Sequence, residues 1–335
     1  MKSPSVSICI PTYNRPFFLL KAIRSCLTQT YKDFEIIVTD NSESDKTKEL
    51  IKSLNHPLIR YYKNPENIGG LNNIIKVLKL AKGKYIKFLM DDDLLKPTCL
   101  ERMVKVLETY PSVGIVMSPM EIINENDERI YPVFYMIKKM YSLYRYQKGS
   151  ALINKKKILT DFLTTVYPCC VPTGIMYRRE CFKKLGTFDQ KAAFAIDVEI
   201  CMRIALEYDF YYLDEILSSW RFNKYSDTIH LHQKGFDINI FYYITEKYLN
   251  NEKTKSLFNE NEWKKIVRKA YLFASKRSVL AIISGIRTYN YSIIYNSIKI
   301  ICRRDKFFLN KLLLPISILY EIIKGILSWF KKNKI

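Results

Sequence analysis

Three adjacent carboxylates, Asp91, Asp92 and Asp93, form the part of this chain best suited to chemistry. They directly follow the apolar run Tyr85–Met90, which has the composition of a buried strand. Neighbouring carboxylates repel one another, so the cluster needs a cation or a cationic ligand. Mg²⁺ and Mn²⁺ prefer carboxylate oxygens and usually share them with a phosphate. The triplet therefore indicates a metal–diphosphate site, and the alternative is a solvated acidic turn that caps the helix starting near Pro97.

Two further polar clusters follow predicted strands. The strand Val6–Ile10 runs into Pro11-Thr12-Tyr13-Asn14-Arg15, and the strand Phe34–Val38 runs into Asp40-Asn41-Ser42. Ligands of open α/β sheets bind beyond the carboxyl ends of the strands, where these clusters would meet the Asp triplet. A Tyr in a tight turn can stack on a base, and an Asp can accept a hydrogen bond from a base N–H. The three clusters together predict a pocket for a nucleotide diphosphate and a metal.

Strand-like and helix-like segments alternate through the first half of the chain. Besides the two strands above and Tyr85–Met90, apolar runs predict strands at Ile59–Tyr62 and Val113–Ser118. Helical spacing predicts helices at Pro16–Leu27, Asp45–Leu54, Asn67–Ala81 and Pro97–Thr109. Continuous apolar strands that alternate with helices indicate a parallel sheet covered by helices on both faces.

The pattern changes from Glu121 onward. Residues 132–170 are irregular and aromatic-rich, which predicts loop with short helices, and residues from about 235 to the end predict helices. Between these lie a predicted hairpin at Glu121–Tyr131, strands at Thr173–Tyr177, Phe210–Leu213 and Ile216–Phe222, and a helix at Ile196–Tyr208.

Length and composition indicate a globular protein of about two domains, since the chain has 335 residues and 48% of them are hydrophobic. Eight cysteines are scattered without CxxC spacing and there are three histidines, which disfavours a zinc site. The cysteines fall mostly in apolar stretches and are interpreted as core residues of a reduced, cytoplasmic protein. No signal peptide opens the sequence given.

The formal net charge is +21, from 54 Lys and Arg against 33 Asp and Glu. Anionic substrates, an anionic membrane or a genome that favours Lys codons would each account for it. The lysines are dispersed and lack the aromatic-interleaved basic motif of RNA-binding modules, so nucleic acid is not a predicted partner.

Motifs of other common α/β folds are missing from the sequence. No GxGxxG follows the first predicted strand, which disfavours dinucleotide binding, and no GxxxxGK[ST] occurs, which disfavours a P-loop nucleotidase. No GxSxG occurs, which disfavours an α/β-hydrolase.

The motifs that are present resemble those of the family 2 glycosyltransferases. The matching stretches, in the family's order, are Val6–Asn14, Ser25–Tyr31, Phe34–Ser42, Asn64–Gly70 and Phe88–Asp93. The resemblance covers roughly residues 4–222 and implies the GT-A fold, a mixed sheet flanked by helices, here followed by a helical C-terminal extension. We expect a catalytic domain at 1–234, with a nucleotide-binding half (1–120) and an acceptor half (121–234), and a basic helical region at 235–335.

The resemblance also implies roles for the polar clusters. Tyr13 and Asp40 match the Tyr and Asp that hold the base in the family, and Pro11 and Thr12 match the residues that shape the turn. Asp92 matches the acid that binds Mg²⁺ or Mn²⁺.

Asp91, beside the metal-binding position, is expected to belong to the nucleotide site, as a partner of the ribose or of the metal. Met90 stands where the first acid of the common D-x-D motif falls, so the motif is only DXD-like. For Asp93 a site role and a helix-capping role both remain open.

A direct displacement at the anomeric carbon needs a carboxylate that deprotonates the incoming hydroxyl. Family members place this acid six residues before an Arg, which here gives Asp197 before Arg203. Glu199 is the competing candidate, and both acids would also favour the N-terminus of a helix electrostatically. Thr173 and Gly174 resemble the segment that lines the acceptor side.

The C-terminal segment 309–330 is apolar but interrupted by Lys311, Glu321 and Lys324. It predicts an in-plane amphipathic helix, with basic residues beside it that favour an anionic cytoplasmic leaflet. The alternative is a helix packed on the catalytic domain or on a second subunit; the oligomeric state is not predicted.

The sequence-based hypothesis is an inverting glycosyltransferase that moves a sugar from a nucleotide-diphosphate donor, with UDP favoured, to a hydroxyl of a glycan or lipid-linked acceptor in surface polysaccharide synthesis. It would act in the cytoplasm, peripherally on the inner face of the cell membrane. A silent nucleotide-sugar-binding protein and a nucleotidyltransferase are the alternatives.

Overall fold

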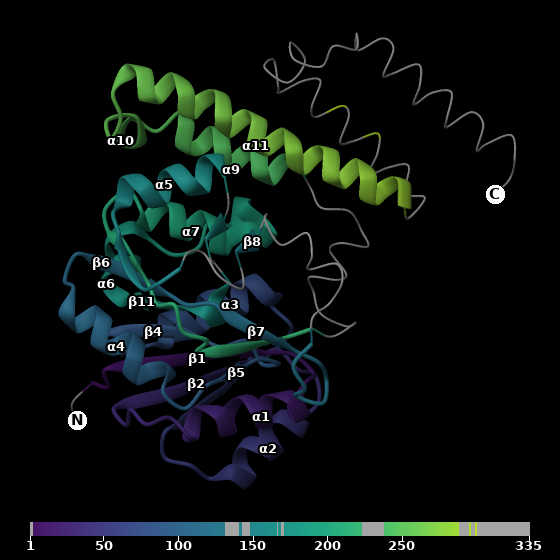
Figure 1. The fold of residues 1–335 in the computed structure, drawn as a ribbon. Helices are drawn as coiled ribbons and strands as arrows, with labels where there is room; N and C mark the ends of the chain where they lie inside the picture. The colour runs from purple at the N-terminus through teal and green to yellow at the C-terminus, as the bar shows by residue number, and fades with distance from the viewer. Residues whose placement is uncertain are drawn as a thin grey trace, which may run out of the picture.

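A computed structural model gives the fold around one large mixed sheet (Figure 1). It describes residues 3–130, 141–142, 148–165, 167–168, 171–222 and 238–287, together with 295 and 299. The strands of the large sheet are β1 (Val6–Thr12), β2 (Phe34–Asp40), β3 (Ile59–Lys63), β4 (Tyr85–Phe88), β6 (Val113–Met117), β9 (Ala151–Ile153), β11 (Ile175–Arg178) and β12 (Asp209–Tyr212). Their order is β3-β2-β1-β4-β11-β6-β12-β9.

Two smaller sheets accompany the large one. A three-stranded sheet has the order β5-β13-β7, with β5 at Leu94–Leu95, β7 at Met120–Ile123 and β13 at Ser218–Arg221. A two-stranded sheet joins β8 (Tyr141–Ser142) to β10 (Tyr167–Pro168).

The helices of the first half are α1 (Pro16–Leu27), α2 (Lys46–Leu54), α3 (Gly70–Leu80) and α4 (Cys99–Thr109). Those of the second half are α5 (Lys155–Thr164), α6 (Arg179–Leu185), α7 (Ile196–Ile204), α9 (Ile238–Leu249), α10 (Glu252–Lys255) and α11 (Glu260–Arg287). The short 3₁₀ helices η2 (Pro172–Gly174) and η3 (Gln190–Ala195) precede β11 and α7.

The sheet separates two apolar clusters because successive strand residues point to opposite faces. On β1, Ile8 and Ile10 pack with residues of α1, α2 and α4, whereas Cys9 packs on the other face with residues of α3, α5, α6 and α7. Residues of α9 and α11 belong to the second cluster as well. Helices therefore cover both faces, as the alternation of elements predicts.

The C-terminal helices lie across one end of the molecule (Figure 1). Figure 1 shows α9 and α11 side by side next to α5 and α7, with α1 and α2 at the opposite end. Lys156 of α5 pairs with Glu262 of α11 at 2.8 Å, and α9 contacts η3. The division between residues 234 and 235 stays a prediction, but the described part of the C-terminal region packs on the acceptor half.

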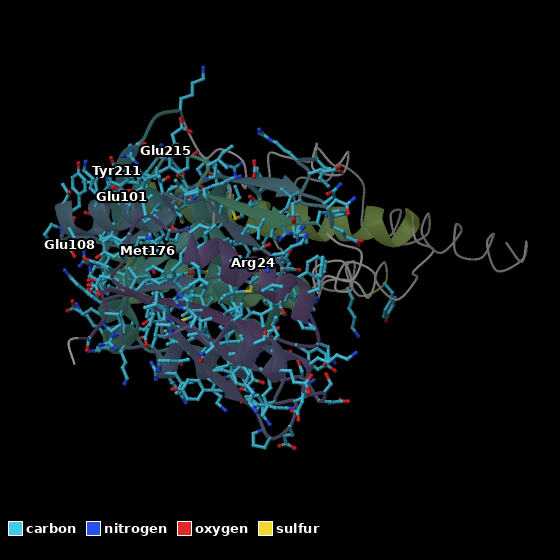
Figure 2. The ribbon with its side chains drawn as sticks, turned by 90° about the horizontal axis from the view of Figure 1, so that it is seen from below. Arg24, Glu101, Glu108, Met176, Tyr211 and Glu215 are labelled. Carbon is cyan, nitrogen blue, oxygen red and sulfur yellow. The ribbon has the colours of Figure 1, made fainter. Side chains whose placement is uncertain are left out.

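Helix α4 is tied to the loop that follows β12. The Nε of Arg102 lies 2.9 Å from a carboxylate oxygen of Glu215, and Tyr110 stacks on Tyr211 with 5.1 Å between ring centroids. Tyr211 and Glu215 lie on the same side of the molecule as Glu101 of α4 (Figure 2). This attachment fixes the path of the chain from β12 into β13, which reaches the candidate site.

Strand direction confirms the mixed sheet that the family resemblance implies: the first-half strands β1, β2, β3 and β4 run parallel, and strands of opposite direction come from the second half. β11 runs antiparallel to both β4 and β6, and β9 runs antiparallel to β12, so the sheet is mixed. Apolar composition shows that a strand is buried, but it carries no information on the direction from which the chain returns.

Several element boundaries differ from the prediction. β4 ends at Phe88, Pro172–Gly174 is a 3₁₀ turn before the strand, and α7 ends at Ile204. The predicted hairpin after Glu121 is present in short form: Ile123 and Arg129 make an antiparallel bridge, and backbone hydrogen bonds join Asn124 to Glu128 and Ile130 to Ile122.

The segment predicted as irregular contains β9 and the ten-residue helix α5. Three consecutive lysines begin α5 and obscure its apolar stripe of Ile158, Leu159, Phe162 and Leu163.

The five described cysteines are buried free thiols, which confirms their interpretation as core residues: Cys9, Cys26, Cys99, Cys181 and Cys201. Burial raises the pKa of the Cys181 thiol to about 12, so that thiol stays protonated. Within the described ranges, no helix has the length and apolar character needed to cross a bilayer. The predicted amphipathic segment 309–330 lies outside those ranges, as do Cys169, Cys170 and Cys302.

Candidate active site

The ends of β1 and β4 are joined through the first two acids of the triplet. Asp91 accepts hydrogen bonds from the Thr12 hydroxyl at 2.7 Å and from the Tyr13 backbone N–H at 3.4 Å. Asp91 and Asp92 are 6% and 8% exposed, so both carboxylates lie mostly out of water. The side chains that the sequence predicts to meet at this edge of the sheet do meet there.

The guanidinium of Arg15 is a cation shared by these two carboxylates. Its Nη1 lies 3.3 Å from Oδ1 of Asp91 and 3.1 Å from Oδ2 of Asp92. Burial and, next, the neighbouring Asp92 raise the pKa of Asp91 to about 7, although Arg15 and Thr12 oppose the shift. Burial and Asp92 thus disfavour the charged form of Asp91, and a cation beside the pair, as Arg15 supplies, favours it.

Asp93 has a different role from its two neighbours. It is fully buried and accepts hydrogen bonds from the Thr173 hydroxyl and, at 2.8 Å, from the backbone N–H of Arg221. Burial and the nearby Asp92 raise its pKa well above the usual range. The N-cap of α4 is Thr98, so the structure does not show the helix cap that the sequence leaves open for Asp93.

Arg221 fastens β13 to the loop that carries the triplet. Its Nε donates to the backbone carbonyl of Asp92 at 2.7 Å, and another guanidinium nitrogen pairs with Asp127. The guanidinium also lies 5.0 Å from the ring centroid of Phe18. A buried Arg with this many partners holds the loop in one conformation.

The acceptor-side turn is fixed from behind by a buried lysine on β4. Lys87 is fully buried, and its Nζ donates to the carbonyls of Thr173 at 2.5 Å and Ile175 at 3.1 Å. Burial lowers its pKa. A Cβ on Gly174 would lie 3.1 Å from the carbonyl oxygen of Ser118, so the turn leaves little room for a side chain at this position.

The base-binding candidates lie at the ends of β1 and β2. Asp40 is buried and accepts hydrogen bonds from the Tyr61 hydroxyl at 2.8 Å and the Ser42 N–H at 2.7 Å. The Asn41 N–H donates to the Thr12 carbonyl at 3.0 Å, which joins the two strand ends. Tyr13 is 44% exposed, so its ring is accessible for stacking.

Asp197 and Glu199 differ sharply although both lie in the first turn of α7. Asp197 is half-buried, and its Oδ1 accepts a hydrogen bond from the Val198 N–H at 2.8 Å. Glu199 is fully buried, and its carboxylate accepts from Arg203 at 3.1 Å and from Lys247 at 2.7 Å. Of the two acids, only Asp197 has a partly accessible side chain.

Four basic residues have no role in the sequence-based prediction although the structure places them at or behind the predicted acids: Arg15, Lys87, Arg221 and Lys247. Lys87 could have been recognised in the sequence, because a charged residue inside an otherwise apolar strand must have buried hydrogen-bond partners. Lys247 could not have been recognised in this way, since it belongs to a helix far along the chain from the acids it contacts.

The carboxylates at this edge of the sheet are the side chains that could bind a divalent metal. In the part of the chain that the structure describes, no group of three or more His, Cys, Asp and Glu side chains is arranged to hold a metal ion. Mg²⁺ needs fewer protein ligands, because it often binds through one or two carboxylates together with substrate phosphates and waters. Asp91 and Asp92 already share one cation, the guanidinium of Arg15, so the pair fits a divalent ion that takes over this contact.

Comparison with protein families identifies the chain. Residues 7–186 match the family model described as Glycosyl transferase family 2. The match covers more than half of the 335 residues, so the chain belongs to this family. The resemblance inferred from the motifs is thereby confirmed.

Curated relatives include glycosyltransferases from bacteria and archaea. An uncharacterised glycosyltransferase of Rickettsia typhi is 28% identical over 217 residues, covering 64% of this chain and 63% of that protein. One of Methanocaldococcus jannaschii is 31% identical over 229 residues, covering 66% and 72%. The GalNAc(5)-diNAcBac-PP-undecaprenol beta-1,3-glucosyltransferase of Campylobacter jejuni is 40% identical over 114 residues, covering 33% and 37%. The chain spans less than two thirds of the first and third of these proteins.

Solved structures with the same fold carry nucleotide sugars. S. aureus TarS 1-349 in complex with UDP-GlcNAc aligns with a TM-score of 0.57 at 14% identity, over 88% of this chain and 89% of that one. A mannosyltransferase from Pyrobaculum calidifontis in complex with GDP-Man and Mn²⁺ aligns with a TM-score of 0.54 at 17% identity, over 91% and 89%. At these identities the likeness shows the fold, and it confirms the expected GT-A architecture.

Proposed function

We propose that this protein is an inverting glycosyltransferase that moves a sugar from a nucleotide-diphosphate donor, with UDP favoured, to a hydroxyl acceptor. The observation that carries the proposal is the paired Asp91 and Asp92 at the end of the sheet, bonded to the turn that presents Tyr13. The pair supplies an anionic cation site beside an accessible aromatic ring. The UDP-GlcNAc complex of TarS supports a UDP-sugar donor.

The donor half of the reaction is assigned to the β1, β2 and β4 ends. Tyr13 stacks on the base, and Asp40 is assigned to a base N–H; Asp40 is fully buried and bonded to Tyr61 and Ser42, so this contact needs the Tyr61 side chain to move aside. Pro11 and Thr12 hold the turn, the latter through its bond to Asp91.

Asp91 contacts the ribose, and Asp92 is the principal metal ligand. The Mn²⁺ in the Pyrobaculum mannosyltransferase complex supports a divalent ion. When bound, Mg²⁺ or Mn²⁺ would neutralise charge on the leaving diphosphate. In its absence Arg15 neutralises the same two carboxylates.

The acceptor half is assigned to Asp197, with Thr173 and Gly174 lining the acceptor side. Asp197 takes the proton from the incoming hydroxyl as its oxygen bonds to the anomeric carbon. The bond between the anomeric carbon and the diphosphate oxygen breaks at the same time, and its electron pair leaves with the nucleoside diphosphate. The complete burial of Glu199, with Arg203 and Lys247 on its carboxylate, supports Asp197 over Glu199 as the base.

The acceptor class is proposed to be a glycan or lipid-linked glycan in surface polysaccharide synthesis. The named substrate of the Campylobacter jejuni relative, a glycan on PP-undecaprenol, supports this class. Work at the cytoplasmic face of a membrane, with contact through residues 309–330, remains part of the proposal.

A screen of nucleotide sugars with and without Mn²⁺ tests the proposed function, with thermal shift and donor hydrolysis as the measurements. We expect UDP-sugars to stabilise the protein, more strongly with Mn²⁺, and Tyr13→Ala to remove the effect. Phe17→Ala is the matched control, since Phe17 is another exposed aromatic, 64% exposed, just beyond the β1 turn. If no nucleotide sugar stabilises the protein or is hydrolysed, the proposal is wrong.

A further inference from the structure

The segment that carries Asp197 is held at both ends by one side chain of the C-terminal region. Lys247, on α9, donates to Oδ2 of Asp189 at 2.6 Å and to Oε1 of Glu199 at 2.7 Å. Asp189 directly precedes η3, and Glu199 lies in the first turn of α7. A single ammonium group thereby closes residues 189–199 into a loop, with Asp197 inside it.

Neighbouring contacts from α9 reinforce this closure. The Tyr243 hydroxyl donates to the same oxygen of Asp189 at 2.8 Å, and the Tyr248 hydroxyl lies 3.0 Å from Oε1 of Glu199. Phe241 packs edge-to-face on Phe194, with 5.5 Å between centroids. Polar and aromatic contacts thus join the whole inner surface of α9 to the loop.

The enclosed loop contains a conformation that needs outside support. Ala193 has φ 44° and ψ −113°. A residue with a side chain in a sparsely populated backbone region persists only when its surroundings hold it there. The contacts from α9 on either side of Ala193 supply this constraint.

We propose that α9 is the positioning element of the catalytic base, with Lys247 as the positioning residue that sets the place of Asp197 through Asp189 and Glu199. This inference rests on the proposed function of Asp197 and extends it to a helix beyond residue 186, where the family match ends. Lys247 itself does not touch the reacting atoms; it acts through the two carboxylates that it joins.

Lys247→Met in the full chain tests the proposal, because it removes the ammonium group and keeps an apolar side chain against α7. A shift of about 1 Å in a reacting group can cost about 10²-fold, so we expect kcat of donor hydrolysis to fall about 10- to 100-fold. The KM and Kd for the donor should not change, since the β1, β2 and β4 ends are untouched. Lys247→Arg should recover most of the loss.

Lys156→Met is the matched control. Lys156 pairs with Glu262 at 2.8 Å and also joins the C-terminal helices to the acceptor half, but it does not contact the loop. We expect this variant to keep its kcat. A Lys247→Met protein with normal kcat, or a Lys156→Met protein with an equal loss, would overturn the proposal.

Hydrogen–deuterium exchange separates this proposal from the proposed function. Lys247→Met should speed amide exchange in residues 187–199 and leave residues 155–164 unchanged, whether or not a donor has been identified. Unchanged exchange in 187–199 overturns the positioning role even if the wild-type enzyme transfers sugar. Faster exchange with no wild-type turnover on any donor would uphold the positioning of the loop and reject the proposed function alone.

Discussion

The donor edge and the base-bearing loop are built in opposite ways. At the donor edge, β1, β2 and β4 are neighbours in the sheet, and short contacts such as Thr12–Asp91 join their ends directly. The loop before α7 is joined instead to α9, more than forty residues further along the chain. Contacts within the sheet therefore organise the proposed nucleotide site. The loop that carries Asp197, the proposed catalytic base, depends instead on α9, a helix that follows the sheet in the chain.

The largest predicted effect is the loss of turnover when the proposed catalytic base, Asp197, is replaced. Asp197→Asn should lower turnover about 10²- to 10⁴-fold, the usual range for loss of a general base, without a change in donor affinity. Glu199→Gln should instead lower the melting temperature, because it weakens the buried contacts with Arg203 and Lys247. Turnover is measured by donor consumption, and UDP binding is titrated alongside. Near-normal turnover in Asp197→Asn would show that Asp197 is not the general base.

The next prediction distinguishes a metal-binding role for Asp92 from a structural role for Asp93. Asp92→Asn should weaken binding of Mn²⁺ with UDP, measured by calorimetry, and cost less thermal stability than Asp93→Ala, because it keeps a polar side chain beside Arg15 and removes the repulsion between Asp92 and Asp91. Asp93→Ala should destabilise the fold by about 1–3 kcal/mol for each buried group left unpaired, here the Thr173 hydroxyl and the Arg221 N–H. Equal thermal losses in both variants would contradict this division of roles.

The smallest predicted effect is a pH dependence on the base side. Burial acts to raise the pKa of Asp189, but hydrogen bonds from Lys247 and Tyr243 outweigh it and lower the pKa to about 2. An unfolded Asp titrates at about 4, so the ionised carboxylate stabilises the fold above this pH, and the contribution disappears as the pH falls from about 4 to about 2.

The melting temperature of Asp189→Asn should therefore depend less on pH between about 4 and about 2 than that of the wild type. The groups that face Asp189 are Lys247, Tyr243 and the backbone N–H of Lys191, and the Glu199 carboxylate shares Lys247 with it. Because Lys247 stays charged throughout this window, a wild-type curve identical to that of the variant would show that Asp189 is not the responsible group.

The sequence predicts that the polar residues after β1, β2 and β4 lie together, because this meeting depends on local patterns. Continuous apolar strands such as Val6–Ile10 identify the sheet, and the polar residues after them must lie at its carboxyl edge. The three aspartates of the triplet nevertheless make different contacts. Nothing in the letters of the triplet shows that Asp93 faces Thr173 and Arg221 while Asp91 and Asp92 face Arg15.

The base side is less predictable because its contacts are not local. Family spacing predicts Asp197 as the base, but Lys247 lies on a helix far along the chain, and only the packed structure shows its contacts with Asp189 and Glu199. The place of β11 between β4 and β6 is likewise not visible in the apolar pattern, because it depends on where a distant segment returns to the sheet.

The position of α9 in the chain has a consequence for synthesis. Ribosomes make proteins from the N-terminus, so the donor edge and Asp197 emerge before Ile238–Leu249 does. When a nascent chain has been made only as far as residue 237, the ends of β1, β2 and β4 are complete but Lys247 is not yet present. If Asp197 is the base, the contacts that hold its loop would therefore form only after the residues of the proposed nucleotide site have been made.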